Sequence, residues 1–224
     1  MKIGPSIMCA NLLRLQDELN YVSQADWLHI DIMDGYMVPD FTFGIEATEQ
    51  ILNYSSLKSE IHLMSKSPLE HVEQYVKLKP DIITFHPEVL YDPLRVVYKL
   101  KEAGIQTGIA INPSIPIVAL NEVIHQVDRV IIMGVNPGFI GQKLLKASLT
   151  KSLHLADIIK QKGLNTDIIL DGGVKLENLK EIYEHKVDGV VVGTGIFHHN
   201  LGTEAALKAF KHTAKELHKE GQYH

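Results

Sequence analysis

The stretch WLHIDIMDG at residues 27–35 sets the pattern from which the fold is predicted. Successive side chains of a β-strand point to opposite faces. One face of this strand therefore carries only aliphatic side chains, those of Leu28, Ile30 and Ile32. The other face carries His29, Asp31 and Met33. In a barrel of parallel strands the aliphatic face packs against surrounding helices, so the histidine and the aspartate are expected to point inward, near the carboxyl end of the strand.

Short β-branched runs like this one alternate with longer amphipathic stretches along the chain. The short runs predict strands at residues 3–8, 27–33, 60–63, 82–86, 107–111, 129–133, 167–170 and 189–192. The longer stretches predict helices at residues 12–23, 45–53, 68–77, 92–103, 118–125, 146–162, 176–184 and 203–217. Repeated strand–helix units of this kind are typical of a parallel sheet.

Eight such units in 224 residues predict one α/β domain over residues 1–224, a TIM (β/α)8 barrel, which typically has about 250 residues. The alternative is an open doubly wound sheet, which usually has fewer strands and a glycine-rich first turn. The first turn here, Cys9-Ala10-Asn11, contains no glycine. Its composition therefore favours the barrel.

The composition narrows the class of partner and the compartment. The formal net charge of −5 argues against nucleic acid and against a membrane surface as the main partner, because both are negatively charged. No run approaches the about 18 consecutive apolar residues of a membrane span, and the apolar run at the N-terminus ends too early for a signal peptide. The single cysteine, Cys9, excludes an internal disulfide and indicates a reducing compartment, so a cytoplasmic protein is expected.

Two more predicted strands place polar side chains at the same end of the barrel. His62 and Met64 share one face of the third strand, and Asp171 directly follows the seventh. Polar groups at the carboxyl ends of barrel strands converge on one site. We therefore predict that His29, Asp31, His62 and Asp171 bind one divalent metal ion, such as Zn, Fe, Mn or Co. The His29–Asp31 pair alone is equally consistent with a purely structural hydrogen bond.

The remaining histidines carry weaker signals. His86 ends the fourth predicted strand and is expected at the rim or beside the metal ligands. The other nine of the 12 histidines lie mostly in predicted helices, at the start of the last loop or at the C-terminus, and are assigned no function.

Glycines cluster after three consecutive predicted strands. PGFIGQ at residues 137–142 follows the sixth strand, Gly172-Gly173 the seventh, and Gly193-Thr194-Gly195 the eighth. A single glycine at such a place is typical of a simple turn. The loops after strands seven and eight of a barrel, however, are the usual phosphate site, where backbone amides bind the anion. The cluster therefore predicts a phosphate-binding region.

These motifs together resemble the ribulose-phosphate 3-epimerase family over nearly the whole chain. The matching segments are Pro5-Ser6, HIDIMDG at residues 29–35, His62-Leu63-Met64, NPGF at residues 136–139, Gly141-Gln142, DGG at residues 171–173 and VGT at residues 192–194. The resemblance implies a TIM barrel with one catalytic divalent metal held by His29, Asp31, His62 and Asp171. It implies that Asp31 and Asp171 are the acid–base pair, and that a homo-oligomer acts on a small ketose phosphate.

The resemblance also implies a set of substrate contacts. Ser6 would contact the substrate, as would His29, His62 and Asp171 in addition to their role as metal ligands. Met33, Met64 and Met133 would line the site. The phosphate would meet Gly138, Phe139, Ile140, Gly141, Gly172, Gly173, Gly193 and Thr194. The implied reaction converts D-ribulose 5-phosphate to D-xylulose 5-phosphate through a metal-stabilised 2,3-enediolate, with one aspartate removing the C3 proton and the other returning one.

Two departures from the family pattern keep a second substrate open. Ile140 stands where the family usually has a small residue, and Met8-Cys9 looks more like the allulose-6-phosphate 3-epimerase branch. That branch would convert D-allulose 6-phosphate to D-fructose 6-phosphate. Two alternatives belong to other functional classes. A metal-dependent phosphohydrolase would release inorganic phosphate, and a non-catalytic phosphosugar-binding barrel would leave the C3 proton in place.

Overall fold

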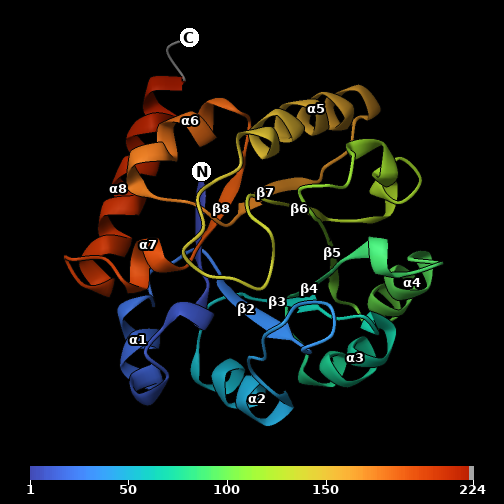
Figure 1. Cartoon of the computed structure of the whole chain (residues 1–224), viewed down its shortest axis with the longest axis horizontal. Coiled ribbons are helices and arrows are strands. Elements are labelled where there is room, and N and C mark those ends of the chain that lie inside the picture. The colour runs from blue at the N-terminus through green and yellow to red at the C-terminus, as the bar shows by residue number, and fades with distance from the viewer. Residues whose placement is uncertain (222–224) are drawn as a thin grey trace.

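Eight parallel strands form a ring that is surrounded by helices (Figure 1). This computed structural model describes residues 1–221; residues 222–224, the end of the expected domain, lie outside the described part. The strands are β1 (Lys2–Pro5), β2 (Leu28–Met33), β3 (Ser59–Met64), β4 (Ile82–Phe85), β5 (Gln106–Ile111), β6 (Arg129–Met133), β7 (Asp167–Asp171) and β8 (Gly189–Val192). Their order is β1-β8-β7-β6-β5-β4-β3-β2, which is the order of a TIM barrel.

The ring closes between β1 and β2. Ser6, directly after β1, forms a parallel bridge with His29 of β2. The first strand was expected to run to residue 8, and this prediction is wrong. The N–H groups of Cys9 and Ala10 donate to the carbonyls of Ser6 and Ile7, so Ile7–Cys9 forms a 3₁₀ turn that bends the chain across the end of the barrel.

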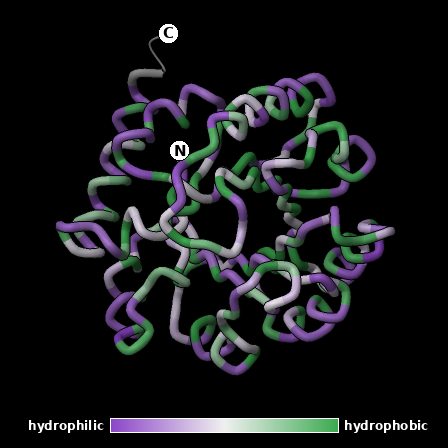
Figure 2. The backbone as a smooth tube through the Cα atoms, in the orientation of Figure 1, coloured by the Kyte–Doolittle hydropathy of each residue, from purple (hydrophilic) through white to green (hydrophobic). Residues whose placement is uncertain are grey.

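The helices cover the outside of the ring and alternate between hydrophilic and hydrophobic residues (Figure 2). They are α1 (Leu15–Tyr21), α2 (Ile45–Tyr54), α3 (Pro68–Tyr75), α4 (Leu94–Glu102), α5 (Lys146–Lys162), α6 (Leu179–Glu184), α7 (Thr194–Phe197) and α8 (Thr203–Gly221). Among the helices of residues 1–221, none is long and apolar enough to cross a membrane.

The helix expected at residues 118–125 is wrong. Two short 3₁₀ turns, Ile117–Leu120 and Ile124–Gln126, take its place. The buried side chains Ile117, Leu120 and Val123 recur at every third position, and the N–H groups of Asn121 and Val123 donate to the carbonyls three residues earlier. This spacing matches the three residues per turn of a 3₁₀ helix, which is easily mistaken in a sequence for the 3.6-residue period of an α-helix.

The core has two layers, as the alternation in the strands predicts. Leu28, Ile30 and Ile32 belong to the large cluster between strands and helices. Inside the ring lies a smaller cluster of Trp27, Ala110, Ile131, Met133, Ile169 and Val191. The interior of a barrel is filled with side chains. Polar side chains inside the ring are therefore surrounded by protein and require partners among themselves.

Candidate active site

Four titratable side chains from three strands meet inside the ring. Asp31 of β2 and His62 of β3 are direct neighbours in the strand pairing, and His29 lies two residues earlier on the same face of β2. Asp171 lies at the end of β7, which is separated from β2 in the ring by β1 and β8. One nitrogen or oxygen from each of the four lies within 4.8 Å of the others. The structure thus brings together the four residues predicted as metal ligands.

Four of the six distances between these atoms are close to those expected around a single cation. His29 Nε2 and His62 Nδ1 lie 3.2 and 3.1 Å from Asp31 Oδ1, and 3.7 and 3.6 Å from Asp171 Oδ2. Ligand atoms at normal bond lengths from one tetrahedral ion lie about 3.3–3.6 Å from one another. The donors are two imidazole nitrogens and two carboxylate oxygens, a set suited to Zn, Fe, Mn or Co.

The two carboxyl groups of the cluster have opposite protonation tendencies. Burial disfavours the charge of Asp31, but the adjacent His29 and His62 outweigh burial and hold its pKa well below the usual range. Burial raises the pKa of Asp171 to about 7; His29 opposes this shift, whereas the negative charges of Asp31 and Glu60 reinforce it. Environments that push two carboxyl pKa values apart are typical of an acid–base pair.

Glu60 is a buried residue of the site that the sequence analysis missed. Its Oε2 lies 3.0 Å from His29 Nδ1, so it holds the ring nitrogen that points away from the cluster. Thr84 Oγ1 and Arg129 Nη1 donate to the same carboxylate at 2.7 and 3.0 Å. Burial opposes the charge of Glu60, but Arg129, His29 and Thr84 lower its pKa to about 2. Because Glu60 precedes His62 by two residues, the strand alternation already placed it on the inward face.

His62 is held differently, through a second imidazole. Its Nε2 lies 3.0 Å from Nε2 of His86, and Nδ1 of His86 lies 3.0 Å from Oε1 of Glu88. His86 is completely buried, so it belongs to the surroundings of the cluster and not to the exposed rim. No role was predicted for Glu88 from the sequence.

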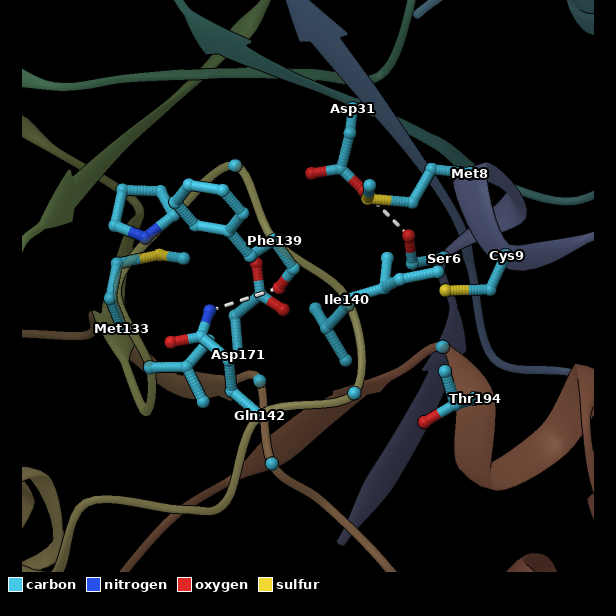
Figure 3. A pocket seen from close by; sticks show the side chains of 18 of the residues that line it. Ser6, Met8, Cys9, Asp31, Met133, Phe139, Ile140, Gln142, Asp171 and Thr194 are labelled. Atoms are coloured by element: carbon cyan, nitrogen blue, oxygen red, sulfur yellow. Dashed lines mark hydrogen bonds between the residues drawn. The ribbon is translucent and has the colours of Figure 1, made fainter. Parts of the chain in front are cut away.

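A pocket opens above the cluster at the carboxyl end of the strands (Figure 3). Asp31 and Asp171 line it together with Ser6, Met33, Met64 and Met133. Ser6 Oγ donates a 2.5 Å hydrogen bond to Asp31 Oδ2. His29 and His62, predicted to contact substrate as well as metal, are fully buried and do not line the pocket.

The predicted phosphate region lines the same pocket. Its members are Gly138, Phe139, Ile140, Gly141, Gly172, Gly173, Gly193 and Thr194. Gly173 has a φ of +71°, and a Cβ atom there would lie 2.5 Å from the backbone nitrogen of Leu144, so only glycine fits this turn. The loop at residues 137–142 is tied together by the side chain of Gln142, whose Nε2 donates to the carbonyls of Asn136 and Phe139 at 2.6 and 3.0 Å.

Other pocket residues had no assigned role in the sequence analysis. Met8 and Cys9 enter the lining because the chain turns across the barrel end after β1, and Lys175 enters just beyond the turn after β7. Burial raises the pKa of the Cys9 thiol to about 12, so this group stays protonated. Ile140 extends its side chain over the pocket (Figure 3).

Solved structures with the same architecture include several enzymes. Phosphoribosyl anthranilate isomerase from Thermococcus kodakaraensis matches with a TM-score of 0.66 and 19% identity, over 95% of this chain and 98% of that one. A mutant tryptophan synthase α-subunit from Pyrococcus furiosus matches with a TM-score of 0.69 and 15% identity, over 96% and 97%. These low identities establish the shared barrel fold alone.

The sequence comparisons are more specific. Residues 2–197 match the model of the ribulose-phosphate 3 epimerase family. Ribulose-phosphate 3-epimerase of Helicobacter pylori is 38% identical over 197 residues, which are 88% of this chain and 91% of that protein. The chloroplastic ribulose-5-phosphate-3-epimerase of Arabidopsis thaliana is 34% identical over 218 residues, 95% of this chain and 78% of that protein. The chain belongs to the ribulose-phosphate 3-epimerase family.

Proposed function

We propose that this protein inverts the configuration at C3 of a ketose phosphate, interconverting D-ribulose 5-phosphate and D-xylulose 5-phosphate. The observation that carries the proposal is the arrangement of the pocket. Two carboxyl groups from different strands, Asp31 and Asp171, line it and belong to a cluster that could hold one cation, and glycine turns line it as well. Family membership supports the same reaction.

Asp31 and Asp171 are the proposed acid–base pair. They come from β2 and β7, which are separated by two strands in the ring, and both reach the pocket. A substrate whose C3 lies between them has one carboxyl group on each face. One aspartate removes the C3 proton and the other donates a proton to the opposite face. A positioned acid or base contributes about 10²–10⁴-fold to a rate.

The four-residue cluster is the proposed site of one divalent ion, held by His29, Asp31, His62 and Asp171. When bound, the ion supplies positive charge that stabilises the enediolate formed by loss of the C3 proton. Ser6 orients Asp31 through its hydrogen bond. Met33, Met64 and Met133 line the pocket with side chains that offer no acidic proton to a carbanion-like intermediate.

The phosphate is proposed to bind on the glycine side of the pocket. Residues 138–141, 172–173 and 193–194 line that side, and backbone amides bind phosphate oxygens without a charged side chain. The Thr194 hydroxyl and Lys175 line the same pocket and add a further donor and a positive charge. We also propose, from the family resemblance, that the protein is a homo-oligomer, which sedimentation of the purified chain tests.

The decisive experiment is incubation of the purified protein with D-ribulose 5-phosphate in D₂O. The expected result is formation of xylulose 5-phosphate with deuterium at C3 and about one divalent ion per chain by metal analysis. Release of inorganic phosphate would instead support a phosphohydrolase, and binding without deuterium incorporation a non-catalytic barrel. A higher kcat/KM for D-allulose 6-phosphate than for D-ribulose 5-phosphate would reassign the substrate to the hexulose.

A further inference from the structure

The two histidines of the metal cluster are supported in different ways. The outer nitrogen of His29 meets a carboxylate directly, since its Nδ1 lies 3.0 Å from Glu60. The outer nitrogen of His62 meets another imidazole, with 3.0 Å between its Nε2 and Nε2 of His86. His86 in turn meets Glu88, 3.0 Å from its Nδ1. Both imidazoles in this second arrangement are completely buried.

The position of the cation site determines which ring nitrogens of His62 and His86 carry hydrogen. Two imidazole nitrogens can form a hydrogen bond only if one carries hydrogen and the other does not. Nδ1 of His62 faces Asp31 and Asp171, at 3.1 and 3.6 Å, and a nitrogen that binds a metal carries no hydrogen. The hydrogen of His62 therefore lies on Nε2, which donates to Nε2 of His86.

The same reasoning extends to Glu88. Because Nε2 of His86 accepts, its hydrogen lies on Nδ1, which donates to Oε1 of Glu88. That oxygen also accepts from the backbone N–H of Asn112 at 3.2 Å, so Glu88 is anchored to the segment that follows β5. Its side chain is only 15% exposed. A negatively charged terminal acceptor favours this direction of all the hydrogen bonds over the reverse.

We infer that His86 and Glu88 are positioning residues that lock the ring of His62 and its tautomer for metal binding. Neither lines the substrate pocket, so they act through His62. Partners of this kind orient a metal-binding imidazole and raise its basicity, and their loss typically weakens metal affinity about 10–100-fold. The inference rests on the metal site of the proposed function.

A matched pair of variants separates positioning from packing. In His86→Gln the amide reaches about as far as Nε2 of the histidine, so it can still accept from His62. In His86→Asn the amide reaches only as far as Nδ1, so it retains the contact with Glu88 and loses the contact with His62. Both variants remove the ring, and therefore a role in packing alone predicts similar effects of the two.

The affinity for Zn²⁺ is measured by competition with a chromophoric chelator. His86→Asn is expected to bind about 10–100-fold more weakly than the wild type, and His86→Gln within about threefold of it. The Zn²⁺ affinity of Glu88→Gln is expected to lie between the affinities of the two His86 variants. At saturating Zn²⁺ the epimerase kcat of His86→Asn is expected to recover most of its loss, because His86 does not touch the substrate. Thermal unfolding in the presence of chelator, followed by circular dichroism, is the control that the metal-free variants are folded.

Long-range ¹H–¹⁵N spectra of the Zn²⁺-loaded wild type read the tautomers without any substitution. The expected result is hydrogen on Nε2 of His62 and on Nδ1 of His86. Hydrogen on Nε2 of His86, or equal Zn²⁺ affinities of the two His86 variants, would overturn the inference. These failures are distinct from failure of the proposed metal site, which would appear as absence of Zn²⁺ binding by the wild type itself.

Discussion

Glu60 on β3 and Arg129 on β6 form a buried ion pair across the interior of the barrel, with Oε2 3.0 Å from Nη1. The two residues are 69 positions apart in the chain. The guanidinium also lies 4.9 Å from the ring centroid of Trp27, a cation–π distance. Because the same carboxylate oxygen contacts His29, the ion pair links the metal cluster to the opposite side of the ring.

Arg129→Met is expected to destabilise the protein by about 3–5 kcal/mol, because it leaves the Glu60 carboxylate buried without its countercharge. Urea unfolding of the metal-free protein measures the loss. The control is the double variant Glu60→Gln with Arg129→Met, which leaves no charge unpaired and is expected to be more stable than Arg129→Met alone. If the double variant loses the sum of both single effects, the two side chains are not coupled.

Asp31→Asn and Asp171→Asn are each expected to lower the rate of C3 deuterium incorporation by at least about 10²–10⁴-fold. Either substitution removes one of the two groups that exchange the proton, while the remaining side chains keep the fold. Asp40→Asn, in the exposed loop after β2, is the control and is expected to retain activity. Substantial exchange in either cluster variant would contradict the two-aspartate scheme.

Ile140→Gly is expected to relax the choice of substrate. The isoleucine side chain extends over the pocket (Figure 3), so its removal leaves room for a longer sugar. The kcat/KM for D-allulose 6-phosphate relative to D-ribulose 5-phosphate should rise by about tenfold, the effect of a small change in pocket volume. Ile140→Val keeps the branched side chain and should leave the ratio close to that of the wild type. A ratio unchanged by the glycine would show that Ile140 does not limit substrate length.

Asp34 makes a pH-dependent contribution to the free energy of unfolding. Its carboxylate accepts from the backbone N–H groups of Tyr36, Met37 and Lys66 at 2.8–2.9 Å, which joins the loops after β2 and β3. Burial opposes the charge, but these donors outweigh burial and lower the pKa of Asp34 below its ordinary value of 3.8. A carboxyl group whose pKa is lowered by folding stabilises the protein above its unfolded pKa and loses that effect as the pH falls through the folded value.

Asp34→Asn is therefore expected to cost about 1–2 kcal/mol at pH 7, the low end for hydrogen bonds to a charged group because Asp34 is partly exposed. The difference from the wild type should shrink as the pH falls below about 4. Thermal melts between pH 7 and pH 3.5 measure it. Glu49→Gln on the exposed face of α2 is the control, and a difference that grows toward low pH would contradict the sign.

Much of the fold and of the candidate site could be predicted from local sequence patterns. The alternation of residues 28–33 placed His29 and Asp31 on the inward face because the backbone geometry of a strand fixes that alternation by itself. The same rule placed His62, and also Glu60, whose role was missed because an inward glutamate has no recognisable function until its partner is known. The expected helix at residues 118–125 failed because period 3.0 and period 3.6 differ little over eight residues.

The sequence by itself determined which side chains point into the barrel, since that depends only on neighbours along the strand. Only the tertiary structure decided which of them meet. Arg129 reaches Glu60 across the barrel from a position 69 residues away, and His86 and Ser6 reach His62 and Asp31 between consecutive strands. The tertiary structure also decides the upward shift of the Asp171 pKa and the downward shift of the Asp31 pKa. Burial and the distances between charges, which cause these shifts, are set only once the ring has closed.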